Sequence, residues 1–142
     1  MTEPDMTRYL MPLRTAAELC LTAIDRMEGG ETFILKMPRV RVGDLVEVLV
    51  EAYAGRFGYR ADEIEIEHIG ARAGEKLHEA LMTDAESRRA IELGDMWVVP
   101  RAGVEPSRVA APEPPELLDR TAIRDLLDSA GWLTPEAIPT LS

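Results

Sequence analysis

The chain has 142 residues, 46% of them hydrophobic and 30% charged, which predicts a globular protein with a modest core. Its formal net charge of −10 would repel a phosphate backbone or an anionic lipid surface, so neither nucleic acid nor a membrane is expected as a partner. A single cysteine excludes an internal disulfide and fits a reducing compartment. No apolar run reaches the length of a membrane span and no signal peptide pattern is present, so we expect a cytoplasmic location.

The first predicted element is a helix. Thr15 and Glu18 have the spacing of a capping box, and apolar residues recur at helical spacing over residues 16–27, before Gly29-Gly30 ends the run. The lone cysteine, Cys20, lies in this apolar series. We therefore predict that Cys20 is a small core residue and not a nucleophile.

The next elements are a strand and a second helix. Residues 32–35 predict a short buried strand, and a helix is expected over about residues 44–57. Glutamate and isoleucine alternate strictly over residues 63–67, which predicts a strand with isoleucines on one face and solvated carboxylates on the other. The helix residues expected to face inward are Leu45, Leu49, Ala52 and Tyr53.

The second half of the chain contains fewer elements. Thr83 and Glu86 form a second capping box, which predicts a short helix ending at about Ala90, and residues 96–99 predict a strand. Three or four short strands among four helices do not make regular βαβ units. We therefore expect a small α+β piece of the α/β class that is part of a larger fold.

The C-terminal region is expected to differ from the rest. Prolines and small residues dominate residues 101–116, which predicts a linker. In the tail, residues 117–142, Asp119 can cap a helix with an apolar face. We expect this helix to dock, with Trp132 available to pack back.

One short segment, "IGARAGEKLHE" at residues 69–79, has the composition of an anion site. Gly70 and Gly74 let the backbone turn around Arg72, whose guanidinium can fork two donors toward a phosphate or a carboxylate. A surface turn with a solvated arginine is the other interpretation. The spacing does not fit a phosphate-binding P-loop or a dinucleotide fingerprint, and Met82 stands where a zinc-protease helix needs its second histidine, so no metal site is expected.

Several segments, taken in order, resemble a known family. They are MTRY (6–9), GGETFILKMPRVRVGDL (29–45), IGARAGEKLHEAL (69–81), ELGD (92–95) and LLDSAGWL (126–133). Together they resemble the C-terminal, substrate-binding part of bacterial polysaccharide-biosynthesis enzymes of the extended short-chain dehydrogenase/reductase type. The similarity is greatest to inverting UDP-N-acetylglucosamine 4,6-dehydratases and related capsule UDP-sugar epimerases.

The resemblance implies roles for individual residues. Arg8 and Arg72 resemble the two arginines that pair with the diphosphate of a UDP-sugar in that family. Glu75 resembles the acidic residue that accepts a hydrogen bond from the ribose. Lys36 and Arg41 stand where the family's loop passes near the nucleotide, so they are further candidate contacts.

The catalytic features of the family are missing from this sequence. Its enzymes hold NAD(P) in a Rossmann half and use a Tyr-x-x-x-Lys pair, but no tyrosine here is followed by a lysine four positions on. We therefore expect no catalytic residue and no cofactor bound by this chain alone, with NAD(P) implied only for the complete enzyme. A split subunit, a truncation and an excised module all fit the absence of the Rossmann half.

Two functions stay open on this basis. In the first, residues 1–100 bind the nucleotide-sugar for a dehydratase (a lyase) or an epimerase, and a separate Rossmann-domain chain supplies catalysis. In the second, the chain is a non-catalytic protein-interaction module or a truncated remnant that uses its apolar faces. A homo-oligomer is expected in either case.

Overall fold

The structure is a computed structural model, which describes residues 1–104 and 113–134. The chain divides into two compact units, each assembled from separated segments. Unit 1 consists of Met1–Pro12, Arg39–Glu79 and Leu117–Ser142, and unit 2 of Leu13–Pro38 and Ala80–Glu116. The functional division into residues 1–100, a linker over 101–116 and a tail over 117–142 stays a prediction, and residues 105–112 and 135–142 lie outside the described part.

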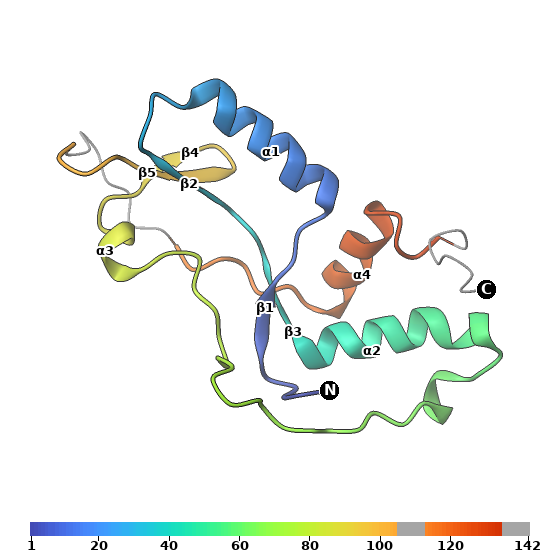
Figure 1. Cartoon of the computed structure of the whole chain (residues 1–142). Coiled ribbons are helices and arrows are strands. Elements are labelled where there is room, and N and C mark those ends of the chain that lie inside the picture. Colours follow the sequence, from blue (N-terminus) through green and yellow to red (C-terminus); the bar gives the residue numbers. More distant parts are fainter. Residues whose placement is uncertain (105–112, 135–142) are drawn as a thin grey trace. The chain divides into compact units, whose positions relative to one another are not determined.

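Unit 1 combines a small antiparallel sheet with two helices (Figure 1). Its elements are β1 (Thr7–Tyr9), β3 (Arg39–Arg41), α2 (Val42–Tyr53), the 3-10 turns η1 (Ala54–Phe57) and η2 (Ala61–Glu63), and α4 (Arg120–Ser129). Strands β1 and β3 pair with Arg8 opposite Val40. Both strands have three residues, too few to show an alternating pattern, which is why the sequence did not predict them.

The core of unit 1 lies where α2 meets α4. Val48 of α2 and Ile123 of α4 are 1% and 0% exposed, and the predicted inward residues Leu45 and Leu49 pack against this cluster. At the rim, Arg124 pairs with Glu51 across the two helices at 2.9 Å. The predicted docking of the C-terminal helix is therefore confirmed.

The predicted cap of α4 is also confirmed. The Asp119 side chain accepts a hydrogen bond from the amide of Ala122 at 2.9 Å. The expectation for Trp132 was wrong, because its side chain is 59% exposed. The backbone oxygen of Trp132 accepts a hydrogen bond from the Tyr53 hydroxyl instead.

The strand predicted over residues 63–67 is wrong. This segment follows η2 as irregular, mostly exposed backbone, and Ile64 is 36% exposed. Its polar contacts are with the N-terminus: the Met1 ammonium donates to the Glu67 oxygen at 2.6 Å, and the Ile69 amide donates to the Met1 oxygen at 2.9 Å. Alternation sorts side chains onto two faces but does not provide the neighbouring strand that a ladder requires.

Unit 2 contains a three-stranded antiparallel sheet of order β2-β5-β4 (Figure 1). Its elements are α1 (Leu13–Arg26), β2 (Thr32–Leu35), α3 (Asp84–Ser87), β4 (Ile91–Leu93) and β5 (Met96–Val99). The strands predicted over residues 32–35 and 96–99 are confirmed and pair directly with each other, and β4 was not predicted. With two small sheets and short helices in the described residues, the chain is the small mixed α/β piece that the sequence predicted.

The core of unit 2 lies on one face of this sheet. Ile34 and Trp97 are directly paired across β2 and β5, and both are buried together with Ala90 and Val99. The Thr83 capping box is confirmed, since the Thr83 amide donates to Glu86 Oε2 at 2.7 Å and the Glu86 amide donates to Thr83 Oγ1 at 3.3 Å. Helix α3 is shorter than predicted, because it ends at Ser87.

Helix α1 differs from its prediction in two ways. It begins at Leu13, directly after Pro12, so Thr15 lies inside the helix and is not its cap. A proline suits the position before the first turn, because the amide it lacks has no acceptor within the helix there. No residue of α1 is buried, and Cys20 is exposed, so the core role predicted for Cys20 was wrong.

Candidate functional site

The segment 72–79 lies alongside strand β1 in unit 1. The Thr7 amide donates to the Leu77 oxygen at 2.9 Å, and Thr7 and His78 form an isolated parallel bridge. Their side chains also meet, with Thr7 Oγ1 3.0 Å from His78 Nδ1, and the Tyr9 hydroxyl donates to the Glu79 oxygen at 3.1 Å. These contacts give His78 a structural role beside β1.

A tight turn over residues 72–75 explains one of the two glycines. The Glu75 amide donates to the Arg72 oxygen at 3.0 Å, which closes the turn, and Gly74 at its third position has φ 83°. A positive φ at that position is characteristic of type II turns and favours glycine strongly. The turn thus brings the side chain of Glu75 back over the amide of Arg72, which donates to Glu75 Oε2 at 3.1 Å.

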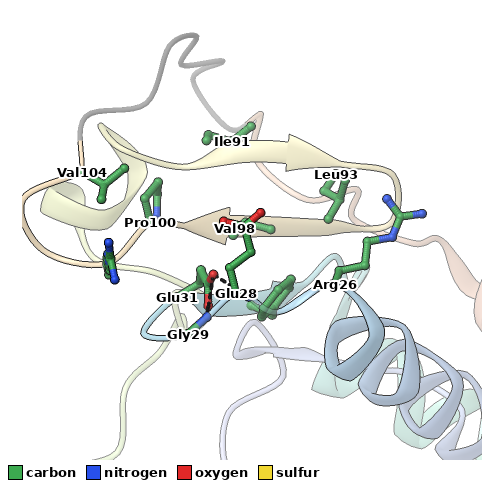
Figure 2. A pocket seen from close by; sticks show the side chains of 11 residues that line it. Arg26, Glu28, Gly29, Glu31, Ile91, Leu93, Val98, Pro100 and Val104 are labelled. Carbon is green, nitrogen blue, oxygen red and sulfur yellow. Dashed lines mark hydrogen bonds between the residues drawn. The ribbon is translucent and has the colours of Figure 1, made fainter.

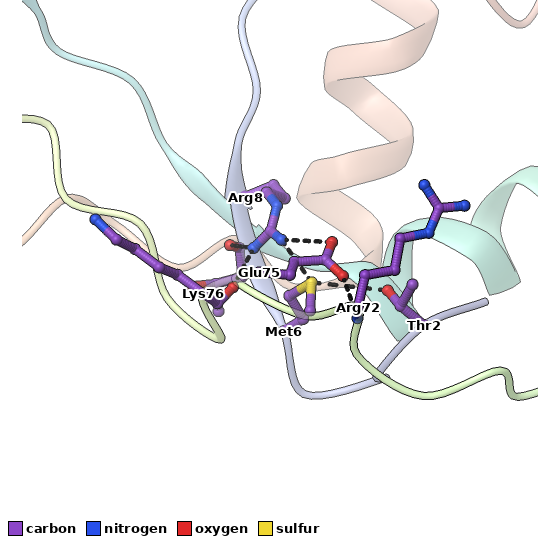
Figure 3. Close-up of polar contacts among 7 residues, drawn as sticks. Thr2, Met6, Arg8, Arg72, Glu75 and Lys76 are labelled. Atoms are coloured by element: carbon purple, nitrogen blue, oxygen red, sulfur yellow. Dashed lines mark hydrogen bonds and ion pairs between the residues drawn. The ribbon is translucent and has the colours of Figure 1, made fainter.

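Arg8 of β1 reaches the same carboxylate (Figure 3). Its Nη2 lies 3.1 Å from Glu75 Oε1, and its Nη1 donates to the Thr7 oxygen at 2.8 Å and the Lys76 oxygen at 3.1 Å. The Arg8 and Glu75 side chains are 30% and 26% exposed, so the pair is only partly screened by solvent. The guanidinium of Arg8 is therefore held in place between strand β1 and the turn over residues 72–75.

Arg72 contributes its backbone amide to this site, but not its side chain. Figure 3 shows the Arg72 side chain extending away from the Arg8 and Glu75 pair. Within residues 1–104 and 113–134, its guanidinium makes no hydrogen bond or ion pair. The structure therefore brings Arg8, Glu75 and the Arg72 amide together, and leaves the Arg72 side chain in solvent.

The site is locally cationic in a strongly acidic chain. Arg8, Arg72 and Lys76 carry three positive charges against the two negative charges of Glu75 and Glu79, whereas the whole chain carries −10. These five charges sum to +1, so this strand and turn do not share the acidic balance of the chain.

The two further candidates, Arg41 and Lys36, lie in different units. Arg41 belongs to unit 1, where it stands opposite Thr7 in the β1 and β3 ladder and pairs with Asp44 at 3.6 Å. Lys36 belongs to unit 2. There its ammonium pairs with Glu92, donates to the Gly94 oxygen at 2.6 Å and lies 4.6 Å from the centre of the Trp97 ring.

Unit 2 contains a groove of about 590 Å³ that the sequence did not predict (Figure 2). Phe33 and Val98, directly paired across β2 and β5, contribute to its apolar lining on the sheet face opposite Trp97. Hydrogen bonds from its own backbone amide and from the amide of Gly29 lower the pKa of Glu31 at the rim. Alternation within the two predicted strands was the signal that could have identified this apolar face.

The strands of both sheets in the described parts of the chain pair antiparallel, whereas the dinucleotide-binding turn joins parallel strands through a helix. The same residues contain no group of three or more His, Cys, Asp or Glu side chains that could hold a metal ion. Among the helices that the structure describes, none is long and apolar enough to span a membrane.

Comparison with known proteins identifies relatives for most of the chain. The sequence model of the family described as polysaccharide biosynthesis protein matches residues 1–101. An uncharacterised membrane protein of Methanocaldococcus jannaschii is 40% identical over 137 residues, which are 94% of this chain and 41% of that relative. A UDP-glucose 4-epimerase of Rickettsia bellii is 36% identical over 102 residues, 72% of this chain and 28% of the epimerase.

A solved structure has a similar fold. The X-ray structure of Pen from Bacillus thuringiensis matches with a TM-score of 0.79 and 35% identity, covering 94% of this chain and 41% of that one. The chain thus spans less than half the length of each of these three relatives.

Proposed function

Because the chain belongs to the polysaccharide biosynthesis protein family, of the extended short-chain dehydrogenase/reductase type, we propose that it binds the diphosphate and ribose of a UDP-sugar. The observation that carries this proposal is the cluster of Arg8, Glu75 and the Arg72 amide in a locally cationic turn. The UDP-glucose 4-epimerase relatives support a nucleotide-sugar as the ligand. In this proposal the chain is the C-terminal part of a sugar-nucleotide dehydratase or epimerase.

The contacts of Arg8 suit it to a diphosphate. Two of its nitrogens already donate hydrogen bonds, one to the backbone oxygens of Thr7 and Lys76 and the other to Glu75. Because these contacts fix the side chain, Arg8 loses little further side-chain entropy when a ligand binds. A phosphate oxygen that takes the place of Glu75 Oε1 gains a charge-assisted hydrogen bond from the same nitrogen. The exposed guanidinium of Arg72 can then rotate toward the second phosphate.

Glu75 acquires a second partner in the same exchange. Once its Oε1 is released by Arg8, the carboxylate still accepts the Arg72 amide through Oε2, which fixes its position. The free oxygen can accept a hydrogen bond from a ribose hydroxyl. The turn over residues 72–75 thus presents one acceptor for the sugar beside the donors for the phosphates.

In this proposal the chemical step is carried out by the Rossmann half of the enzyme. Epimerisation and dehydration in this family use NAD(P) and a Tyr-x-x-x-Lys pair, and no tyrosine of this chain is followed by a lysine four positions on. Its contribution is to bind and orient the nucleotide end of the substrate. The purified chain with added NAD(P) should therefore show no turnover of UDP-N-acetylglucosamine.

Calorimetric titration of UDP into the purified chain tests the binding proposal. Arg8→Ala and Arg72→Ala should each weaken binding by about 1.5–3 kcal/mol, because each removes charge-assisted hydrogen bonds. Arg72→Lys should restore only part of the loss, since an ammonium has no planar fork. Glu75→Gln should weaken the binding of UDP more than the binding of pyrophosphate, because pyrophosphate has no ribose.

Arg60 provides a matched control in the same unit. Its side chain is 75% exposed and pairs with Asp62, away from the turn over residues 72–75 in sequence. Arg60→Ala also removes one positive charge but should leave UDP affinity unchanged; the linker residue Arg108 lies outside the described residues and is less suitable. The proposal would be contradicted if the unmodified chain did not bind UDP, or if both arginine variants bound UDP as tightly as the unmodified chain does. Arg72 would then be simply a solvated turn residue.

A further inference from the structure

Helix α1 presents an apolar stripe that the described residues of unit 2 leave exposed. Leu13 is 85% exposed, Leu21 64% and Ile24 61%. Met27, the residue directly after the helix, is 58% exposed, and its amide still donates to the Ala23 oxygen at 2.9 Å. Ala17 and Cys20 on the same helix are also exposed. We call these six residues the α1 stripe; large apolar side chains in such a row are unusual on a surface that stays in water.

The spacing of the stripe shows that it is one continuous surface. At about 100° per residue, its six positions fall within roughly 120° of the helix circumference. The half-buried Ala16, Leu19 and Ala23 occupy the adjoining arc, and α1 contacts β2 of its own unit. The apolar surface of α1 is therefore wider than the part that its own sheet shields.

The relatives indicate what covers the stripe. The match to the Methanocaldococcus jannaschii protein and to Pen extends over 94% of this chain but only 41% of each relative. In both relatives, the counterpart of this chain therefore shares its polypeptide with a larger remainder. An apolar helix face needs an apolar partner, and this remainder is the protein that accompanies the helix in its relatives.

We propose that the α1 stripe is the docking surface for that remainder of the family's polypeptide, whether it is joined to this chain or supplied as a separate protein. A second copy of the chain is a weaker candidate. Two paired helices of this length, about 21 Å each, present a small contact beside the roughly 800 Å² per partner that a stable interface typically buries.

Cys20 allows a direct test, because it is the single cysteine of the chain and lies within the stripe. The rate of thiol labelling of Cys20 is measured by mass spectrometry in the chain alone. It is then measured in a full-length hybrid, in which this chain replaces its counterpart in the Bacillus thuringiensis protein. Docking should slow the labelling by roughly tenfold or more, because a covered thiol reacts only after local opening.

Two lysine substitutions on the same helix make the test specific. Ile24→Lys lies in the stripe and should restore fast labelling of Cys20 in the hybrid, since a charge cannot be buried there without a partner. Thr15→Lys adds the same charge at an exposed position outside the stripe and should leave the protection intact. If the hybrid does not fold, the remainder is added to the intact chain as a separate protein and the same rates are compared.

Three results would overturn the proposal. The first is equal labelling of Cys20 in the chain alone and in the presence of the remainder, in whichever of the two formats is used. The second is protection in the chain alone that increases with its concentration, because this identifies a second copy as the occupant. The third is protection that Ile24→Lys and Thr15→Lys affect equally, because this places the contact outside the stripe.

Discussion

Helices α1 and α2 are similar in sequence pattern and opposite in outcome. Both are amphipathic and of similar length, Leu13–Arg26 and Val42–Tyr53. Helix α2 buries Val48 against Ile123 of α4, a residue more than seventy positions later in the chain. Helix α1 buries none of its residues. An amphipathic pattern therefore shows that a helix has an apolar face, but a partner contributed from elsewhere decides whether that face is buried.

The positively charged side chains repeat this contrast. Lys36 in unit 2 is engaged by a carboxylate, a backbone oxygen and an aromatic ring, whereas Arg72 in unit 1 extends into solvent. In unit 2 the cation Lys36 is paired and helix α1 has an exposed apolar face. In unit 1 helix α2 is packed against α4 and the side chain of Arg72 is unpaired within the described residues. Each of these differences can be tested by matched substitutions in the two units.

The largest expected effect separates two isoleucines. Ile123→Ala should destabilise the protein by about 2–5 kcal/mol, because Ile123 is 0% exposed and its removal leaves a cavity between α2 and α4. Ile24→Ala removes the same atoms from a side chain that is 61% exposed and should change stability by less than about 0.5 kcal/mol. Urea denaturation followed by circular dichroism measures both; similar losses would mean that α1 is packed in solution.

A second comparison concerns the two candidate cations Arg8 and Lys36. Arg8→Ala should lower UDP affinity by about 1.5–3 kcal/mol, whereas Lys36→Ala should leave it unchanged because the proposed site is built from Arg8, Arg72 and Glu75 of unit 1 and Lys36 belongs to unit 2. Lys36→Ala should instead lower the stability of unit 2 by about 0.5–1 kcal/mol. Titration and denaturation on the same two proteins decide, and a larger affinity loss for Lys36→Ala would move the site toward unit 2.

The helix caps should differ more modestly. Asp119→Ala removes the acceptor for the Ala122 amide at the start of a ten-residue helix and should cost about 1 kcal/mol. Thr83→Ala removes a comparable cap from the four-residue helix α3 and should cost less, since little structure depends on it. Thermal unfolding of the two variants provides the measurement. A larger loss for Thr83→Ala would show that α3 supports more of unit 2 than its length suggests.

The smallest expected effect is a pH dependence in unit 2. Hydrogen bonds from the Thr83 amide and hydroxyl lower the pKa of Glu86 below its ordinary value of 4.5. A carboxyl with a lowered folded-state pKa contributes stability that is fully present above 4.5 and is lost as the pH falls through the folded-state value. Stability should therefore be insensitive to Glu86 near neutral pH and decrease below 4.5, and Glu86→Gln should reduce that decrease. A variant with the same acid dependence as the parent protein would contradict this.

Several features of the protein were determined by the sequence alone, and all of them are local. The Thr83 box and the Asp119 cap join groups three residues apart, so their residue types suffice to predict them. The strands at residues 32–35 and 96–99 were visible as short apolar runs between breakers. The family was also readable, because its segments keep their order along the chain.

Other features depended on partners far away in the chain, and only the tertiary structure decided them. Arg8 and Glu75 are 67 positions apart, so no local pattern reveals that they pair. Residues 63–67 alternate like a strand but have no neighbouring strand to complete a ladder. Cys20 lies on an apolar face like the buried residues of α2, yet it is exposed because the described part of unit 2 places nothing over it. Burial and pairing are properties of two surfaces, and a sequence pattern specifies only one of them.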